Sequence, residues 1–256
     1  MAKCIEIFEV CKFPHSMVAY LKATILPGCP LPSPPLYKMY RAKEPDDPRD
    51  LVGGQVLSHR WIDPGMLERW KSTCNGRHAG LCKGVPQESL RRIRPTWLID
   101  AKLRCVIPAP DNRSFVALSY VWGNQSTVKA TLATMGHLQR VRALSNTPIA
   151  KTIEYAMGIT ELLDEKYLCV DDLCILQDDE SQKHIEMSKM AAIYANSAVT
   201  ILAVEGRHAN SGLKGFHGIS EARNLCQSFH RLAEGTEIIL FPMGLNQLEL
   251  GAHQTD

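Results

Sequence analysis

The sequence of 256 residues lacks a strong charge of either sign, because 29 lysines and arginines face 27 aspartates and glutamates, giving a formal net charge of +2. Such a balance produces no overall field that would attract nucleic acid or anionic lipid. A short basic cluster at residues 91–94 is typical of a solvated surface. We therefore expect no nucleic-acid partner.

Long apolar runs are also lacking. The stretch 198–204 is among the longest, and it is far shorter than the ~18 to 20 residues that cross a bilayer. The N-terminus does not combine a basic start, an apolar run and a small-residue cleavage site. The nine cysteines are odd in number and follow no regular framework. These absences favour a cytoplasmic protein in a reducing compartment, with no membrane partner.

Several catalytic motifs are missing as well. Neither G-x-x-x-x-G-K-[ST] nor G-x-G-x-x-G occurs, so we do not expect nucleotide hydrolysis of the P-loop kind. Ser119 lacks the G-x-S-x-G elbow of hydrolases. Cys174 would need a nearby histidine to act as a nucleophile, and the spacing of His184 and His208 does not support one. A buried thiol and a hydrogen-bonding serine are the simpler interpretations.

The sequence that is present begins with a proline-rich part. Seven prolines between residues 27 and 50 predict an irregular N-terminal extension over residues 1–51. Residues 52–112 are expected to form a lead-in segment that packs on the core. They contain a short helix near 64–74, with Pro64 in its first turn, and a strand-like stretch at 96–107.

Three soft ligands in the lead-in, Cys74, His78 and Cys82, have a spacing that could hold a structural zinc ion. A closed zinc site needs four ligands, and the fourth would be His59 or Cys105. Free thiols and a surface histidine are the alternative.

Strands and helices alternate after residue 113. Apolar runs at 115–121, 166–170 and 198–204 predict three strands, and amphipathic patterns at 147–164 and after Asp178 or Asp179 predict two helices. Short connections in this order indicate parallel strands joined by right-handed crossovers. We therefore predict an α/β fold with an open, mostly parallel sheet and flanking helices.

The helices are predicted from caps and apolar positions. Thr147 is expected to cap the first helix, with Pro148 in its first position. Its apolar stripe comprises Ile149, Ile153, Ala156, Met157, Thr160 and Leu163. The apolar positions of the second helix include Ile185, Met187, Met190, Ile193 and Tyr194.

Polar or aromatic groups follow each predicted strand, at Trp122-Gly123, Asp171-Asp172 and Glu205-Gly206. In open α/β sheets, ligands bind outside the carboxyl ends of the strands. Clustered carboxylates at this edge could act in catalysis or hold Mg²⁺. The alternative is structural, since Asp178 and Asp179 are common helix caps and an aspartate can simply solvate a turn.

Five blocks in one order resemble the fungal heterokaryon incompatibility (HET) domain. They are F-V-A-L-S-Y-V-W-G (115–123), T-P-I-A-K-T-I-E-Y-A (147–156), K-Y-L-C-V-D-D-L-C-I-L-Q-D-D (166–179), M-A-A-I-Y-A-N-S-A-V-T-I-L-A (190–203) and G-L-K-G-F (212–216). The resemblance places the domain at residues 113–218, after a typical lead-in. Residues 219–256 form a C-terminal tail that is short for the family, which leaves open a truncated copy. Cys169 stands where the family usually has tryptophan.

The resemblance implies nonself recognition and programmed cell death signalling, through a protein partner or self-association. It also implies a flavodoxin-like core similar to TIR domains, some of which hydrolyse NAD⁺, so NAD or a related nucleotide is the expected substrate if the protein is an enzyme. Apart from this substrate and the structural zinc ion considered above, no cofactor is expected. The catalytic candidates are Asp171 and Glu205. The ligand- or partner-facing candidates are Ser119, Tyr120, Trp122, Gly123, Asp172, Cys174, Gln177 and Asp178.

Overall fold

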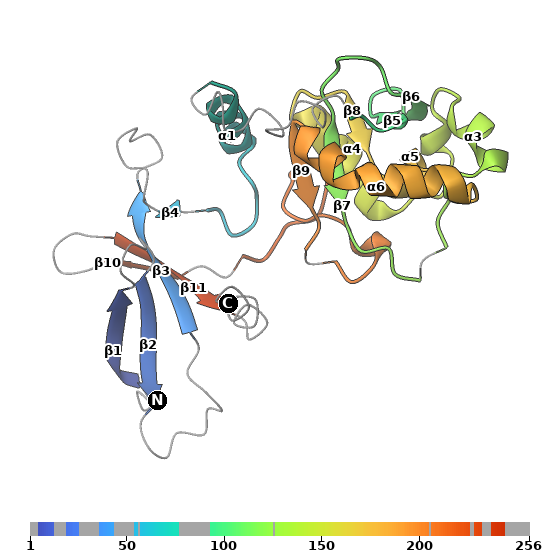
Figure 1. Cartoon of the computed structure of the whole chain (residues 1–256). Helices are drawn as coiled ribbons and strands as arrows, with labels where there is room; N and C mark the ends of the chain where they lie inside the picture. The colour runs from blue at the N-terminus through green and yellow to red at the C-terminus, as the bar shows by residue number, and fades with distance from the viewer. Residues whose placement is uncertain are drawn as a thin grey trace. The chain divides into compact units, whose positions relative to one another are not determined.

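The computed structural model describes ten stretches of the chain (Figure 1). They are residues 5–12, 19–25, 36–43, 54–55, 57–76, 93–124, 126–204, 206–225, 228–231 and 237–243. The chain divides into two compact units. Unit 1 comprises Met1–Arg60 and Asn224–Asp256, and unit 2 comprises Trp61–Arg223.

Unit 1 is built around a sheet that joins the two ends of the sequence. Its antiparallel strand order is β1 (Ile5–Lys12), β2 (Ala19–Ile25), β3 (Leu36–Lys43), β11 (Glu237–Met243) and β10 (Ser228–Arg231), and β4 (Gly54–Gln55) pairs with β3. The sequence predicts an irregular N-terminal extension, whereas the described parts of this segment form the strands β1, β2 and β3. Its prolines fall outside β1, β2 and β3, and β11 comes from the far end of the sequence, where a local pattern cannot reveal it.

Unit 2 contains a mixed five-stranded sheet. Its order is β6 (Cys105–Pro108), β5 (Trp97–Asp100), β8 (Tyr167–Cys169), β7 (Val116–Ser119) and β9 (Val199–Leu202). Strand β7 is parallel to both β8 and β9, which confirms the three predicted parallel strands and the α/β class. Strand β5 is antiparallel to β8 and β6. The order β8-β7-β9 is compatible with a flavodoxin-like core.

The strand-like stretch at 96–107 is a hairpin, β5–β6. Asp100 Oδ1 accepts a hydrogen bond from Leu103 N at 2.9 Å, and Arg104 has a φ of 52°. A side-chain acceptor and a left-handed residue close the turn. Asp100 is buried, and its Oδ2 lies 3.2 Å from Lys166 Nζ next to β8.

Helices connect and cover the parallel strands. Helix α4 (Lys151–Leu162) leads from β7 to β8, and α6 (Glu180–Asn196) leads from β8 to β9. Because β8 and β9 flank β7, right-handed crossovers place these two helices on opposite faces of the sheet. The remaining helical elements are α1 (Pro64–Gly76), α3 (Leu132–Leu138), α5 (Asp171–Cys174), η1 (Ala143–Ser145) and η2 (Ala209–Ser211). None of the helices in the described ranges is long and apolar enough to cross a bilayer.

The core lies between the sheet and these helices. Phe115 and strand residues 116–118 are buried, as is nearly the whole predicted stripe of α4 from Ile153 to Leu163. Each fully buried large aliphatic side chain contributes roughly 1.5 to 3 kcal/mol relative to exposure in water. The apolar periodicity thus identified the buried face of α4 correctly.

The predicted start of α4 at Thr147 is wrong, because the helix begins at Lys151. The Thr147 hydroxyl donates to Ala143 O at 2.7 Å, so it belongs to the preceding 3₁₀ turn. Lys151 N instead donates to Asn210 Oδ1 at 3.0 Å. A cap that comes from 59 residues further along the chain leaves no local sequence signal.

The apolar pattern of α6 was only partly correct. Ile185 and Met187 are 52% and 56% exposed, whereas Ile193 is buried. Between the two exposed residues, Glu186 is buried and accepts a hydrogen bond from Thr96 Oγ1 at 2.9 Å. A satisfied carboxylate therefore takes a buried position on the helix, whereas the pattern expected its neighbours Ile185 and Met187 to be buried.

Candidate functional site

The ends of β7 and β9 meet at the carboxyl edge of the parallel strands. The ladder pairs Ser119 with Leu202, and Ala203 N donates to Ser119 O at 2.9 Å. Further along, Ala209 N donates to Trp122 O at 2.9 Å. The loops after these two strands are therefore bonded to each other.

Gly123 allows this close approach. Its φ is +63°, and a Cβ at this position would lie 2.7 Å from His208 Cβ. Both the left-handed backbone and the contact require a residue without a side chain. The sequence-based interpretation of Trp122-Gly123 as a sharp break is consistent with this geometry.

Asp172 is the buried acid of the site, at 1% exposure. Its Oδ2 accepts a hydrogen bond from Tyr120 OH at 2.7 Å, and its Oδ1 lies 3.6 Å from Lys129 Nζ. Within the described residues, Oδ1 has no hydrogen-bond donor. Burial, followed by the bond to Asp172, raises the pKa of Tyr120 far above its ordinary value. Tyr120 therefore stays protonated and donates.

Asp171 is less buried, but both of its oxygens accept hydrogen bonds. Trp122 Nε1 donates to Oδ2 at 3.0 Å, and Asp172 N donates to Oδ1 at 2.9 Å. Burial raises the pKa of Asp171 to about 6, although the Trp122 bond opposes this shift, and the nearby Asp172 charge adds to it. A carboxyl group that titrates close to neutral pH is a recognised feature of catalytic sites.

Lys129 completes this cluster, and sequence reasoning missed it. Its Nζ lies 4.1 Å from the centroid of the Trp122 ring, a cation–π contact. The adjacent Ala130 fixes its position, since Ala130 N donates to Asp172 O and Ala130 O accepts from Gln177 N, both at 2.8 Å. A lone lysine in an otherwise irregular stretch carries no sequence signal. We call Tyr120, Trp122, Lys129, Asp171 and Asp172 the strand-end network.

Three other predicted residues hold the surrounding loops. Gln177 Nε2 donates to Asp171 O at 3.0 Å and to Ile175 O at 2.9 Å. Asp178 accepts from Leu132 N at 3.0 Å, at the first residue of α3. Cys174 is buried, and its Sγ accepts from Val170 N at 3.3 Å. These contacts are structural, and Cys174 does not face the surface.

Asp179 has the capping role that its position suggested. Its Oδ1 accepts hydrogen bonds from Gln182 N at 3.0 Å, at the start of α6, and from Ser181 Oγ at 2.8 Å. These two bonds lower the pKa of Asp179. Of the four acids at 171–179, two therefore belong to the strand-end network and two bind helix N-termini.

The zinc prediction and one catalytic candidate fall partly beyond the described structure. Glu205, His78 and Cys82 lie outside the described residues, whereas Cys74 is a free, partly buried thiol. Across the ranges that the structure does describe, no group of three or more His, Cys, Asp or Glu side chains could hold a metal ion.

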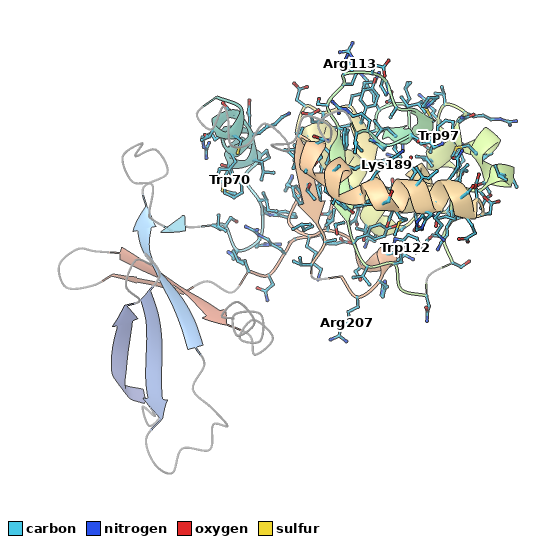
Figure 2. The ribbon with its side chains drawn as sticks, in the orientation of Figure 1. Trp70, Trp97, Arg113, Trp122, Lys189 and Arg207 are labelled. Carbon is cyan, nitrogen blue, oxygen red and sulfur yellow. The ribbon has the colours of Figure 1, made fainter. Side chains whose placement is uncertain are left out.

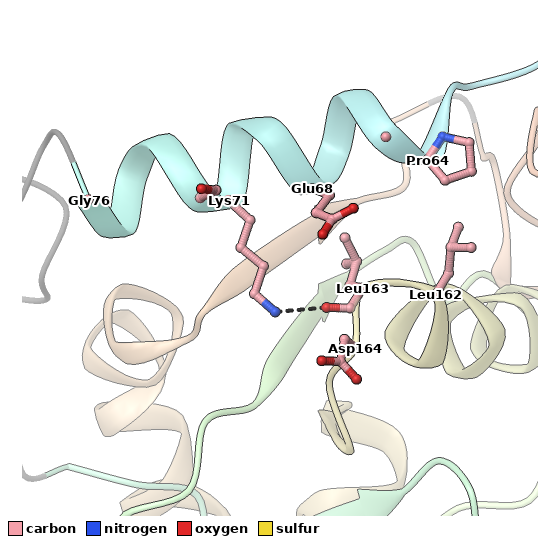
Figure 3. Close-up of a pocket in the computed structure, with 9 residues that line it drawn as sticks. Pro64, Glu68, Lys71, Gly76, Leu162, Leu163 and Asp164 are labelled. Carbon is pink, nitrogen blue, oxygen red and sulfur yellow. Dashed lines mark hydrogen bonds between the residues drawn. The ribbon is translucent and has the colours of Figure 1, made fainter.

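A cavity of about 780 Å³ lies elsewhere in unit 2, between α1 and the end of α4 (Figure 3). Lys71 reaches from α1 and donates to Leu163 O at 2.7 Å. It also pairs with Glu165 Oε1 at 2.6 Å. A cation at a helix C-terminus stabilises the helix dipole. We therefore interpret Lys71 as the contact that docks α1.

Fold and site together define an α/β domain with acids and aromatic side chains at the carboxyl ends of its parallel strands. Residues 115–241 match the model of the family described as heterokaryon incompatibility protein (HET). The chain is thus a heterokaryon incompatibility domain protein, as the five sequence blocks indicated. No curated protein and no solved structure matches the chain.

Proposed function

We propose that this protein acts in fungal nonself recognition and programmed cell death signalling, by binding a protein partner or a second copy of itself. The observation that carries the proposal is a set of exposed apolar side chains at the strand ends. Val121, Leu202 and Val204 are 53%, 62% and 84% exposed. We call these three residues the edge patch.

The strand register places the three residues of the edge patch at the same end of two neighbouring strands. Ser119 and Leu202 are a pair and are the last residues of β7 and β9. Val121 and Val204 each follow two residues after this pair. Strand β9 is an end strand of the described five-stranded sheet. Exposed apolar groups at a sheet edge are typical of surfaces that bind other chains.

The strand-end network holds the residues on both sides of Val121. Tyr120, next to Val121, is tied to buried Asp172, and Trp122 is tied to Asp171. Because these acids already accept hydrogen bonds from the chain itself, their first role in this proposal is to hold the β7 loop rigid. A rigid surface loses less conformational entropy when it binds.

The experiment is a cell-death assay in fungal cells that produce the protein. Replacing Val121, Leu202 and Val204 together by serine is expected to abolish death. The matched control replaces three exposed apolar side chains outside the edge patch by serine, at Leu132, Val141 and Ile185, and it should retain death. Equal activity of the two triple variants, both folded by circular dichroism, would overturn the proposal.

A second candidate function is hydrolysis of NAD or a related nucleotide by strand-end carboxylates. The pKa of about 6 at Asp171 favours it, since a general acid or base works best when its pKa is near the operating pH. The test is NAD⁺ turnover at high protein concentration by wild type, Asp171→Ala and Glu205→Ala. Cleavage that is lost in a folded variant supports the hydrolase. No cleavage by a folded, self-associated wild type excludes it.

A further inference from the structure

The loop that follows β9 lines a second, open cavity of about 370 Å³. It is lined by Gly206, Arg207, His208, Ser211, Gly212 and Lys214. The charged side chains among these lining residues are all basic, and a hydroxyl and an imidazole accompany them. The volume lies near the lower end of the range of ~300 to 1,000 Å³ that is typical of small-ligand sites. We call it the loop pocket.

The position of the loop pocket matches a general rule for α/β sheets. Strand β7 comes first in the parallel part but lies between β8 and β9, so the strand order reverses there. Ligands of such sheets bind outside the carboxyl ends of the strands at that reversal. The hydrogen bond from Ala209 N to Trp122 O and the contact of Gly123 with His208 place the pocket loop beside the end of β7.

The two strongest cations of the pocket are available to a ligand. Among the described residues, ion pairs are found for Lys71, Lys151 and Lys166, but none for Arg207 or Lys214. Both side chains are exposed. Figure 2 shows Arg207 extending from the loop into solvent. Two cations without an ion pair beside one cavity favour an anion there.

We infer that the loop pocket binds the phosphate group of a small ligand. The planar guanidinium of Arg207 can donate two parallel hydrogen bonds to phosphate oxygens, and Lys214 adds a point charge. Ser211 also lines the pocket; its Oγ accepts a hydrogen bond from His208 N at 3.3 Å, and its hydroxyl can donate to a ligand. This site is separate from the edge patch and does not depend on the proposed partner binding.

Isothermal titration calorimetry of the full chain tests the inference, with pyrophosphate and ADP as probes at low salt. The double variant Arg207→Gln with Lys214→Gln should weaken binding of both probes at least tenfold. The control, Lys102→Gln with Arg140→Gln, makes the same change of charge. Lys102 lies in the β5–β6 turn. Arg140 lies just before Arg142 and Leu144, whose backbone N–H groups donate to carbonyls of this turn. Strand β6 is at the other end of the sheet from β9.

The result that supports the inference is binding of both probes by the wild type and the control, with loss in the pocket variant. Three results would overturn it: no binding of either probe by the wild type, equal weakening by both double variants, or binding of ADP without pyrophosphate. The last would show recognition of the nucleoside rather than the phosphate. Circular dichroism on each variant verifies the fold.

Discussion

Asp171→Asn is expected to change how the stability of the protein depends on pH. The wild-type carboxyl group has a pKa of about 6 in the folded chain, compared with an ordinary value of 3.8, chiefly because it is buried. The folded state therefore binds this proton more tightly than the unfolded state does. Asparagine has nearly the same shape but does not titrate, so the variant removes this one linkage.

The sign and size of the effect follow from the two pKa values. Asp171 costs no stability below about pH 3.8, costs progressively more as the pH rises toward 6, and carries its full penalty above that. At about 1.4 kcal/mol per pKa unit, the penalty is at most ~3 kcal/mol. Because Asp171 is partly exposed, we expect roughly 1 to 3 kcal/mol.

A separate, pH-independent cost comes from hydrogen bonding. The single amide oxygen of asparagine can accept from either Trp122 Nε1 or Asp172 N, so the other donor loses its acceptor, at about 1 kcal/mol. The variant should thus be less stable than the wild type at pH 4. Between pH 4 and pH 7.5, the free energy of unfolding of the variant should rise relative to that of the wild type by roughly 1 to 3 kcal/mol.

Urea denaturation of both proteins at several pH values, followed by circular dichroism, measures this difference. Subtracting the two curves cancels the groups that the proteins share, such as Glu221, whose pKa is lowered to about 2 by Lys151. A difference that stays flat with pH, or that falls as the pH rises, would refute the buried environment that we assign to Asp171.

Three further substitutions, with Gly136→Ala as a control, test individual contacts of the structure by urea denaturation. Tyr120→Phe removes a donor from buried Asp172 and should cost roughly 1 to 3 kcal/mol, so unchanged stability would contradict the hydrogen bond. Gly123→Ala should destabilise by ~1 to 3 kcal/mol because of its positive φ and close contact, whereas Gly136→Ala, in open space within α3, should stabilise by about 0.5 to 1 kcal/mol. Asn210→Ala should cost about 1 kcal/mol as the cap of α4 is lost, and a neutral result would show that water replaces it.

The parallel strands and the buried face of α4 could be predicted because their signals are local. The runs ending at Ser119 and Cys169 are apolar and β-rich, and the stripe from Ile153 onward has helical spacing. The carboxyl-edge location of Asp171 then followed from the order of the elements.

Features that depend on residues far apart in the sequence could not be predicted. Asn210 caps a helix that begins 59 residues earlier, and buried Glu186 accepts a hydrogen bond from Thr96, which lies 90 residues before it. Lys129 joins the strand-end network through backbone bonds of its neighbour Ala130. The same limit applies to the β3–β11 pairing in unit 1, which joins the two ends of the sequence.

In the proposed function, the protein binds through the edge patch and Asp171 is a structural residue. The most direct test compares cell death in fungal cells that produce folded Asp171→Asn or the triple serine variant at Val121, Leu202 and Val204. We expect that Asp171→Asn kills as wild type does and that the triple variant does not. Survival with Asp171→Asn, together with death from the triple variant, would contradict it and assign the function to the carboxylate.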